Sequence, residues 1–118
     1  MIPLFLQYPA CSTCQKALAW LDAHDIAYEV RDIKEQNPTE EELRAWQAKS
    51  GLPLRRFFNT SGLLYKGFGL KEKLPSMPEA EQFALLAQHG MLVKRPLVVA
   101  DDAVLVGFRE AEWSAALL

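Results

Sequence analysis

The sequence is poor in the residues that hold structural metal ions. It contains two cysteines and two histidines in 118 residues. A structural zinc site needs four such ligands and would use every one of them, so we expect none. The four residues are Cys11, Cys14, His24 and His89. Neither histidine has an acid or a nucleophile at a recognisable catalytic spacing, so we expect both at helix ends rather than in an active site.

Long apolar runs and surplus positive charge are also missing. No stretch approaches the roughly 18 apolar residues of a membrane-spanning helix, and the apolar start lacks the basic segment of a secretory signal. The chain has 13 Lys and Arg against 15 Asp and Glu, a net charge of −2, which argues against broad electrostatic binding to nucleic acid. We therefore expect a cytoplasmic monomer that binds neither membranes nor nucleic acid directly.

The sequence does contain a pair of thiols in a reactive setting. The motif Cys11-Ser12-Thr13-Cys14 follows an apolar run at 2–6 and opens a helical pattern. A thiol at a helix N-terminus meets free N–H groups and the positive end of the helix dipole, which favour its thiolate. We predict that Cys11 is the nucleophile and that Cys14, one turn further on, resolves a mixed disulfide on Cys11. The alternative is that both are small buried apolar residues without redox chemistry.

Apolar periodicity predicts an α/β chain with a mixed four-stranded sheet. The expected elements are a strand at 2–7, a helix at 12–24, a strand at 26–33, a helix from Thr39 to Gly51, helical turns at 54–58 and 70–74, a helix at 76–88 that stops at Gly90, strands at 97–100 and 104–106, and a helix at 110–117. The first two strands should be parallel and the last two an antiparallel hairpin. We interpret this order as one thioredoxin-like domain, 1–118, with a helical insertion at about 38–90.

Two basic segments lie outside the thiol motif. In thioredoxin-like folds a cis proline faces the active thiol, so we predict a cis Arg95–Pro96 bond and place Arg95 beside an oxyanion or thiolate. The alternative for Arg95 is a solvated charge at a strand end. Lys16 is the second cation we expect near Cys11. The segment 54–62 carries two arginines beside two phenylalanines, which favours either an anion or partner site or a short helix with a solvated basic edge.

The whole chain resembles the arsenate reductase/Spx family, especially its members that carry a CxxC pair. The residues that carry the resemblance are Tyr8–Lys16, Leu54–Gly62, Leu70–Leu74, Lys94–Val99 and Val106–Phe108. The resemblance implies a thioredoxin-like fold with a nucleophilic cysteine at Cys11. We assign Cys11, Cys14 and Arg95 to catalysis, and Ser12, Thr13, Lys16 and Pro96 to substrate binding.

The resemblance leaves three functions open. We expect an oxidoreductase of thiols and disulfides that needs no metal or organic cofactor and is recycled by glutathione, glutaredoxin or thioredoxin. The first alternative is an Spx-like regulator that binds the C-terminal domain of the RNA polymerase alpha subunit. The second is a glutaredoxin-coupled arsenate reductase. Those reductases hold the oxyanion with three arginines, of which only Arg95 is in register here, because the arginines expected near Asn59 and Gly107 are missing. Arg55, Arg56 and Arg109 are available but out of register.

Overall fold

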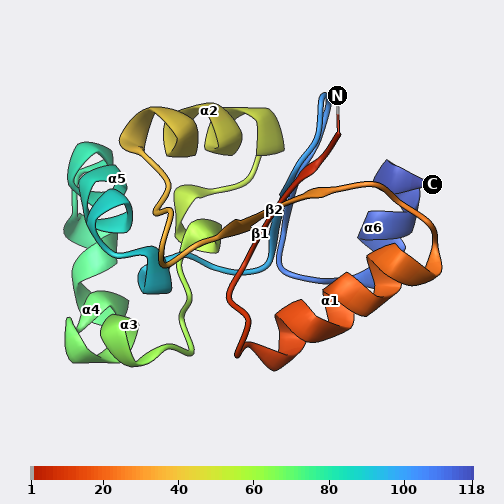
Figure 1. The fold of residues 1–118 in the computed structure, drawn as a ribbon. Coiled ribbons are helices and arrows are strands. Elements are labelled where there is room, and N and C mark those ends of the chain that lie inside the picture. Colours follow the sequence, from red (N-terminus) through yellow and green to blue (C-terminus); the bar gives the residue numbers. More distant parts are fainter. Residues whose placement is uncertain (1) are drawn as a thin grey trace.

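A four-stranded mixed sheet forms the centre of the computed structural model, which describes residues 2–118 (Figure 1). Its strands are β1 (Leu4–Gln7), β2 (Glu29–Asp32), β3 (Leu97–Val99) and β4 (Val104–Val106), in the spatial order β2-β1-β3-β4. Strand β1 is parallel to β2 and antiparallel to β3, and β3 is antiparallel to β4. The predicted thioredoxin-like sheet is confirmed.

Helices cover the two faces of the sheet. They are α1 (Ser12–Ala23), α2 (Glu40–Ser50), α3 (Leu63–Gly67), α4 (Leu70–Lys73), α5 (Glu79–Gln88) and α6 (Glu110–Leu117), with short 3₁₀ turns at Leu54–Phe57, Leu74–Ser76 and Gly90–Leu92. In Figure 1, α1 and α6 lie on one side of the sheet, and α2 to α5, which connect β2 to β3, lie on the other. Within residues 2–118 no helix is long and apolar enough to cross a membrane.

The alternation of side chains along β1 divides the core in two. Phe5 and Leu6 are both fully buried, but they point to opposite faces of the sheet. Phe5 packs in a cluster with residues of α1 and α6, whereas Leu6 packs with the helices that connect β2 to β3. The three tryptophans are buried, Trp20 and Trp113 in the first cluster and Trp46 in the second. The thiol-bearing helix α1 is therefore fixed to the sheet by its own aromatic core.

Several predicted boundaries hold because local chemistry sets them. Thr39 and Glu42 form a capping box at the start of α2, and Gly51 ends that helix with a φ of 69°. The two N-terminal strands are shorter than predicted, because only 4–7 and 29–32 find paired partners in register. Helix α3 was not predicted. It has five residues, none of them buried, so it leaves no apolar periodicity in the sequence.

The predicted role of Gly90 as the stop of α5 is wrong. The helix ends at Gln88, His89 is its extended C-cap, and Gly90 begins the following 3₁₀ turn. Gly90 is needed for another reason: a Cβ there would lie 2.1 Å from the Ile33 carbonyl oxygen. The glycine allows the chain after α5 to pass against the end of β2.

We therefore expect Gly90→Ala to lower the free energy of unfolding by about 1–3 kcal/mol, because the backbone of Ile33 would have to shift. Urea unfolding measures this loss. Gly67→Ala is the control, since a Cβ there meets nothing within 4 Å and alanine suits the helix better than glycine. Equal stability of the two variants would contradict the close approach.

Candidate functional site

The two cysteines lie at the start of α1, as predicted. Cys11 is the N-cap of the helix, with φ −81° and ψ 118°, and is half-buried. Its N–H donates to the Tyr8 carbonyl at 3.0 Å, and the Gln15 side chain holds the Pro9 carbonyl at 2.9 Å. These bonds turn the chain sharply from β1 into α1. Cys14 points inward and is completely buried, so one thiol faces solvent and the other lies beneath it.

The pKa of the Cys11 thiol is lowered from its ordinary value of 9.0. Burial of the thiol raises the pKa, but the Cys14 N–H and thiol, the charge of Arg95 and the N–H of Thr13 together outweigh burial. Cys11 closes no regular capping hydrogen bond in the structure, so we attribute the lowering to N–H dipoles and a cation that face the sulfur. Cys11 is consequently the better nucleophile of the pair at neutral pH.

The pKa of Cys14 is raised to about 12, chiefly by burial. The hydrogen bond with Cys11 and the negative charge of Cys11 contribute to this rise, while the Tyr8 backbone and Arg95 oppose it. The titrations of the two thiols are therefore coupled, and Cys11 loses its proton at a lower pH than Cys14.

Arg95 is the cation that the structure brings to the thiols. The Arg95–Pro96 peptide bond is cis, as predicted. The Arg95 guanidinium donates to the Met91 carbonyl at 3.2 Å and lies 5.6 Å from the centre of the Tyr8 ring, in a cation–π contact. Its Nε is buried without a hydrogen-bond partner. A buried donor without a partner costs stability, which favours a site that a ligand completes.

The remaining candidate residues differ in their exposure to solvent. Ser12, Thr13 and Lys16 are exposed on the first turns of α1, and Pro96 is buried at the start of β3. Lys16 is not among the groups that shift the pKa of either thiol. Thr13, by contrast, lines a pocket that also contains Arg95.

That pocket is strongly basic. It has a volume of about 250 Å³ and is lined by Thr13, Arg56, Lys94, Arg95, Val106, Gly107, Phe108 and Arg109. Four of these residues are cationic and none is acidic. We refer to it as the basic pocket. Sequence reasoning missed Lys94, whose only signal is its place before the Arg95–Pro96 pair. The arginines come from distant segments, so their convergence follows from the fold rather than from spacing.

An apolar pocket of about 540 Å³ also borders Arg95. It is lined by Asn59, Ser61, Gly62, Leu63, Leu64, Met91 and Arg95. We refer to it as the apolar pocket. Sequence reasoning missed it because α3, which supplies its leucines, leaves no periodic pattern.

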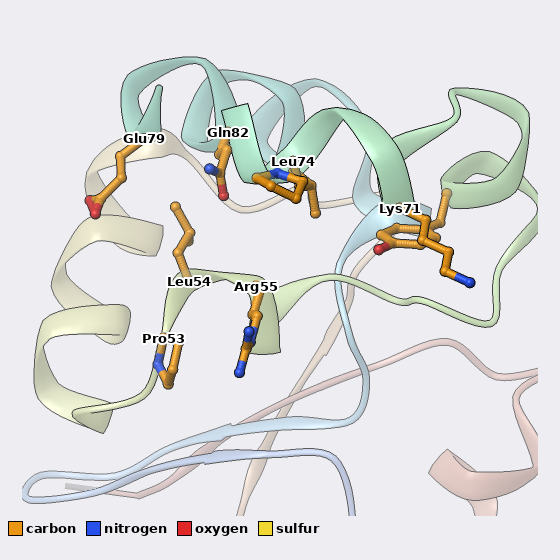
Figure 2. Close-up of a pocket in the computed structure, with 9 residues that line it drawn as sticks. Pro53, Leu54, Arg55, Lys71, Leu74, Glu79 and Gln82 are labelled. Atoms are coloured by element: carbon orange, nitrogen blue, oxygen red, sulfur yellow. The ribbon is translucent and has the colours of Figure 1, made fainter. Parts of the chain in front are cut away.

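The segment 54–62 divides between structural and surface roles. Phe57 and Phe58 are buried, which confirms the short helix with a basic edge. Arg56 reaches the basic pocket, whereas Arg55 lines a separate cavity of about 630 Å³. Figure 2 shows that cavity, with Arg55, Lys71, Glu79 and Gln82 around it. Neither a cysteine nor Arg95 lines it, so we exclude it from the thiol site.

The histidines lie at helix ends, as predicted. His24 caps the C-terminus of α1, where its Nδ1 lies 2.8 Å from the Trp20 carbonyl oxygen, and His89 caps α5. In the part of the chain that the structure describes, no three His, Cys, Asp or Glu side chains converge to hold a metal ion.

Alkylation should distinguish the two thiols by pH. We expect Cys11 to reach half of its maximal rate below pH 9.0, because its lowered pKa raises the thiolate fraction near neutrality. Cys14 should stay unreactive until the pH nears 12. Iodoacetamide labelling with peptide mass analysis measures both. Arg95→Met should move the Cys11 profile to higher pH, and Lys34→Met, at an exposed lysine after β2, should not. Coincident profiles for the two thiols would contradict the asymmetry.

Comparison with known proteins gives consistent matches along the chain. The ArsC family model matches residues 6–116. The uncharacterized protein YusI of Bacillus subtilis is 50% identical over 109 residues, which cover 92% of each chain. The global transcriptional regulator Spx of Staphylococcus epidermidis is 29% identical over 112 residues, 95% of this chain and 83% of Spx. A solved structure of an ArsC family related protein from Bacteroides fragilis is 60% identical, covers 98% of this chain and 97% of that chain, and has a TM-score of 0.95.

Proposed function

The chain belongs to the ArsC family, and from that membership and its paired thiols we propose that it is a thiol–disulfide redox protein. Cys11 is the nucleophile and Cys14 the resolving thiol. The observation that carries the proposal is the asymmetry of the pair: Cys11 is the accessible N-cap of α1, and Cys14 is buried one turn beneath it with its proton retained.

The first step is attack of the Cys11 thiolate on one sulfur of a disulfide. The disulfide bond breaks, a mixed disulfide forms on Cys11, and the released thiolate takes up a proton. Cys14 then loses its proton to solvent and attacks the Cys11 sulfur. The second substrate thiolate leaves, and the Cys11–Cys14 disulfide holds the oxidation. Two electrons have passed from the protein dithiol to the substrate.

The order of these steps follows from the coupling of the two thiols. While Cys11 is a thiolate, its charge and its hydrogen bond raise the pKa of Cys14. Once Cys11 is in a mixed disulfide its charge is gone, so both of these effects disappear. Burial is then the one remaining effect that raises the pKa of Cys14, and the Tyr8 backbone and Arg95 still lower it. The pKa of Cys14 is thus lower after Cys11 has reacted than before, although burial still raises it.

The protein disulfide is reopened by a cellular thiol, either glutathione or a reductant protein of the glutaredoxin or thioredoxin type. The test is turnover of hydroxyethyl disulfide with each reductant in turn. We expect the protein to accelerate disulfide reduction above the rate of the reductant alone. If none of the three reductants gave an acceleration, the proposal of an oxidoreductase would be wrong.

A second candidate is a redox-gated regulator, which the similarity to Spx over 95% of the chain supports. In this function the same disulfide changes the affinity for the C-terminal domain of the RNA polymerase alpha subunit. Binding of that domain to the reduced and the oxidised protein tests it. Affinity that changes with redox state would support regulation, and no binding in either state would remove it.

Arsenate reduction is the function that the site supports least. The arginines expected near Asn59 and near Gly107 are missing, and each lost charge-assisted contact costs about 1.5–3 kcal/mol. Arg56 and Arg109 contribute charge to the basic pocket instead. Arsenate added with glutathione and glutaredoxin should therefore give no turnover above the reaction without protein.

A further inference from the structure

Arg95 lines both the basic pocket and the apolar pocket, and its charge also acts on Cys11. A ligand that fills either pocket therefore lies beside Arg95, the cation that acts on the reactive thiol. We propose that the substrate of Cys11 is a disulfide-bonded cysteine in an extended polypeptide segment that carries an apolar side chain on one flank and an acidic side chain on the other. The inference rests on the proposed thiol chemistry and names the class of its substrate.

The apolar pocket is built to receive a side chain from outside. Leu63 is 88% exposed, more than Ile2, Val30 or Leu118, the other large exposed apolar residues in the described part of the chain. A leucine that stays in water at the rim of a pocket lacks the stabilisation that burial would give. An apolar side chain placed between Leu63, Leu64 and Met91 would recover part of it.

The position of Leu63 is fixed by the residues before it. Gly62 is the N-cap of α3, and a Cβ at Gly62 would lie 2.7 Å from Nδ2 of Asn59. Glycine lets the chain enter α3 this close to Asn59 without displacing the Asn59 side chain. The turn from Asn59 to Gly62 therefore sets where Leu63 lies in the apolar pocket.

The charge of the basic pocket favours an anionic ligand. Its cations are Arg56, Lys94, Arg95 and Arg109, with no acidic residue among those that line it. Arg109 has an acidic neighbour, Glu112, but the pair is 3.7 Å apart and largely exposed, so it neutralises little of the charge. The buried Nε of Arg95 has no partner. A carboxylate in this pocket would meet several donors at once.

An extended segment can reach both pockets from one cysteine. In an extended chain the residues two positions before and two positions after the cysteine project from the same face as its thiol. With the thiol at Cys11, the inference places one of these two side chains in each of the pockets that Arg95 borders. A small thiol has one such group at most and would leave one pocket unfilled, so the two pockets together favour a polypeptide.

The test uses short peptides whose central cysteine is joined to thionitrobenzoate, a coloured leaving group. One pair of peptides has leucine and glutamate at the two flanking positions, in either order. In a second pair glutamine replaces glutamate, and in a third alanine replaces leucine. Glutathione disulfide and the neutral hydroxyethyl disulfide are measured alongside. We expect the better leucine–glutamate peptide to react about tenfold faster than its glutamine or alanine counterpart, with the glutamate advantage reduced by salt.

Matched variants assign the preference to the two pockets. Leu63→Asp and Arg56→Glu should each lower the ratio of the peptide rate to the hydroxyethyl disulfide rate about tenfold. Their controls are Leu118→Asp, at another exposed leucine, and Arg55→Glu, at the neighbouring arginine that lines a different cavity. Both controls should leave the ratio unchanged.

Equal rates for all peptides would overturn the inference, and so would a rate for glutathione disulfide that matches the best peptide. In both cases reaction of hydroxyethyl disulfide would leave the proposed function intact. If no disulfide of any kind reacted with Cys11, the proposed function itself would fail.

Discussion

Cys11→Ser is expected to lower the rate of disulfide reduction at least about a thousandfold, because a serine hydroxyl is not ionised at neutral pH and cannot replace the thiolate. Cys14→Ser should have a different result. It retains the first attack but cannot release the product, so the substrate thiol stays attached to Cys11. Mass spectrometry of the intact protein measures the trapped adduct, and the coloured product measures the rate.

The contrast between these variants tests the assignment of roles. Cys11 is accessible with a lowered pKa, and Cys14 is buried with its pKa raised to about 12. Exchange of their roles would require Cys14 to be exposed. A trapped adduct on Cys14 in the Cys11→Ser variant, or a Cys11→Ser variant with an unchanged rate, would contradict the mechanism. Circular dichroism of both variants is the control for folding.

Trp113→Ala should have the largest effect on stability, a loss of about 3–5 kcal/mol in the free energy of unfolding. Trp113 is 1% exposed and packs edge-to-face against Phe5, Trp20 and Phe108. Its Nε1 donates to the Gly107 carbonyl at 3.1 Å. Alanine would remove the aromatic contacts and leave a cavity between α1, α6 and the sheet.

Urea unfolding measures the loss, and Leu118→Ala, at a 66% exposed residue on the same end of the chain, should change stability by no more than about 0.5 kcal/mol. A loss below about 1 kcal/mol for Trp113→Ala would show that the aromatic cluster is not a stabilising unit. The cluster also supports the site, because Gly107 and Phe108 line the basic pocket.

The features that could be predicted from sequence are those that neighbouring residues determine. The N-cap position of Cys11 follows from an apolar strand that runs directly into a helical pattern. The capping box of Thr39 and Glu42 is contained in four consecutive residues. The cis Arg95–Pro96 bond was predicted from the fold that the thiol motif indicated. Each of these signals is short and needs no knowledge of distant contacts.

The features that could not be predicted depend on distant segments. Gly90 looked like a helix stop, but its constraint is the carbonyl of Ile33, which belongs to another part of the chain. The basic pocket collects Arg56, Lys94 and Arg109 from three segments. Nothing in their spacing indicates a common site, because the sheet and its connections bring them together. The position of the paired thiols at the start of a helix was therefore readable from the sequence, while the cationic residues that gather near Arg95 required the structure.

The most direct test of the paired-thiol mechanism is an equilibrium redox titration of the purified protein in thiol buffers, with the Cys11–Cys14 disulfide followed by mass. We expect a reversible intramolecular disulfide with a potential between about −270 and −200 mV, the range of thioredoxins and glutaredoxins. If no intramolecular disulfide formed at any redox poise, Cys14 would not be a resolving thiol and the mechanism would be wrong.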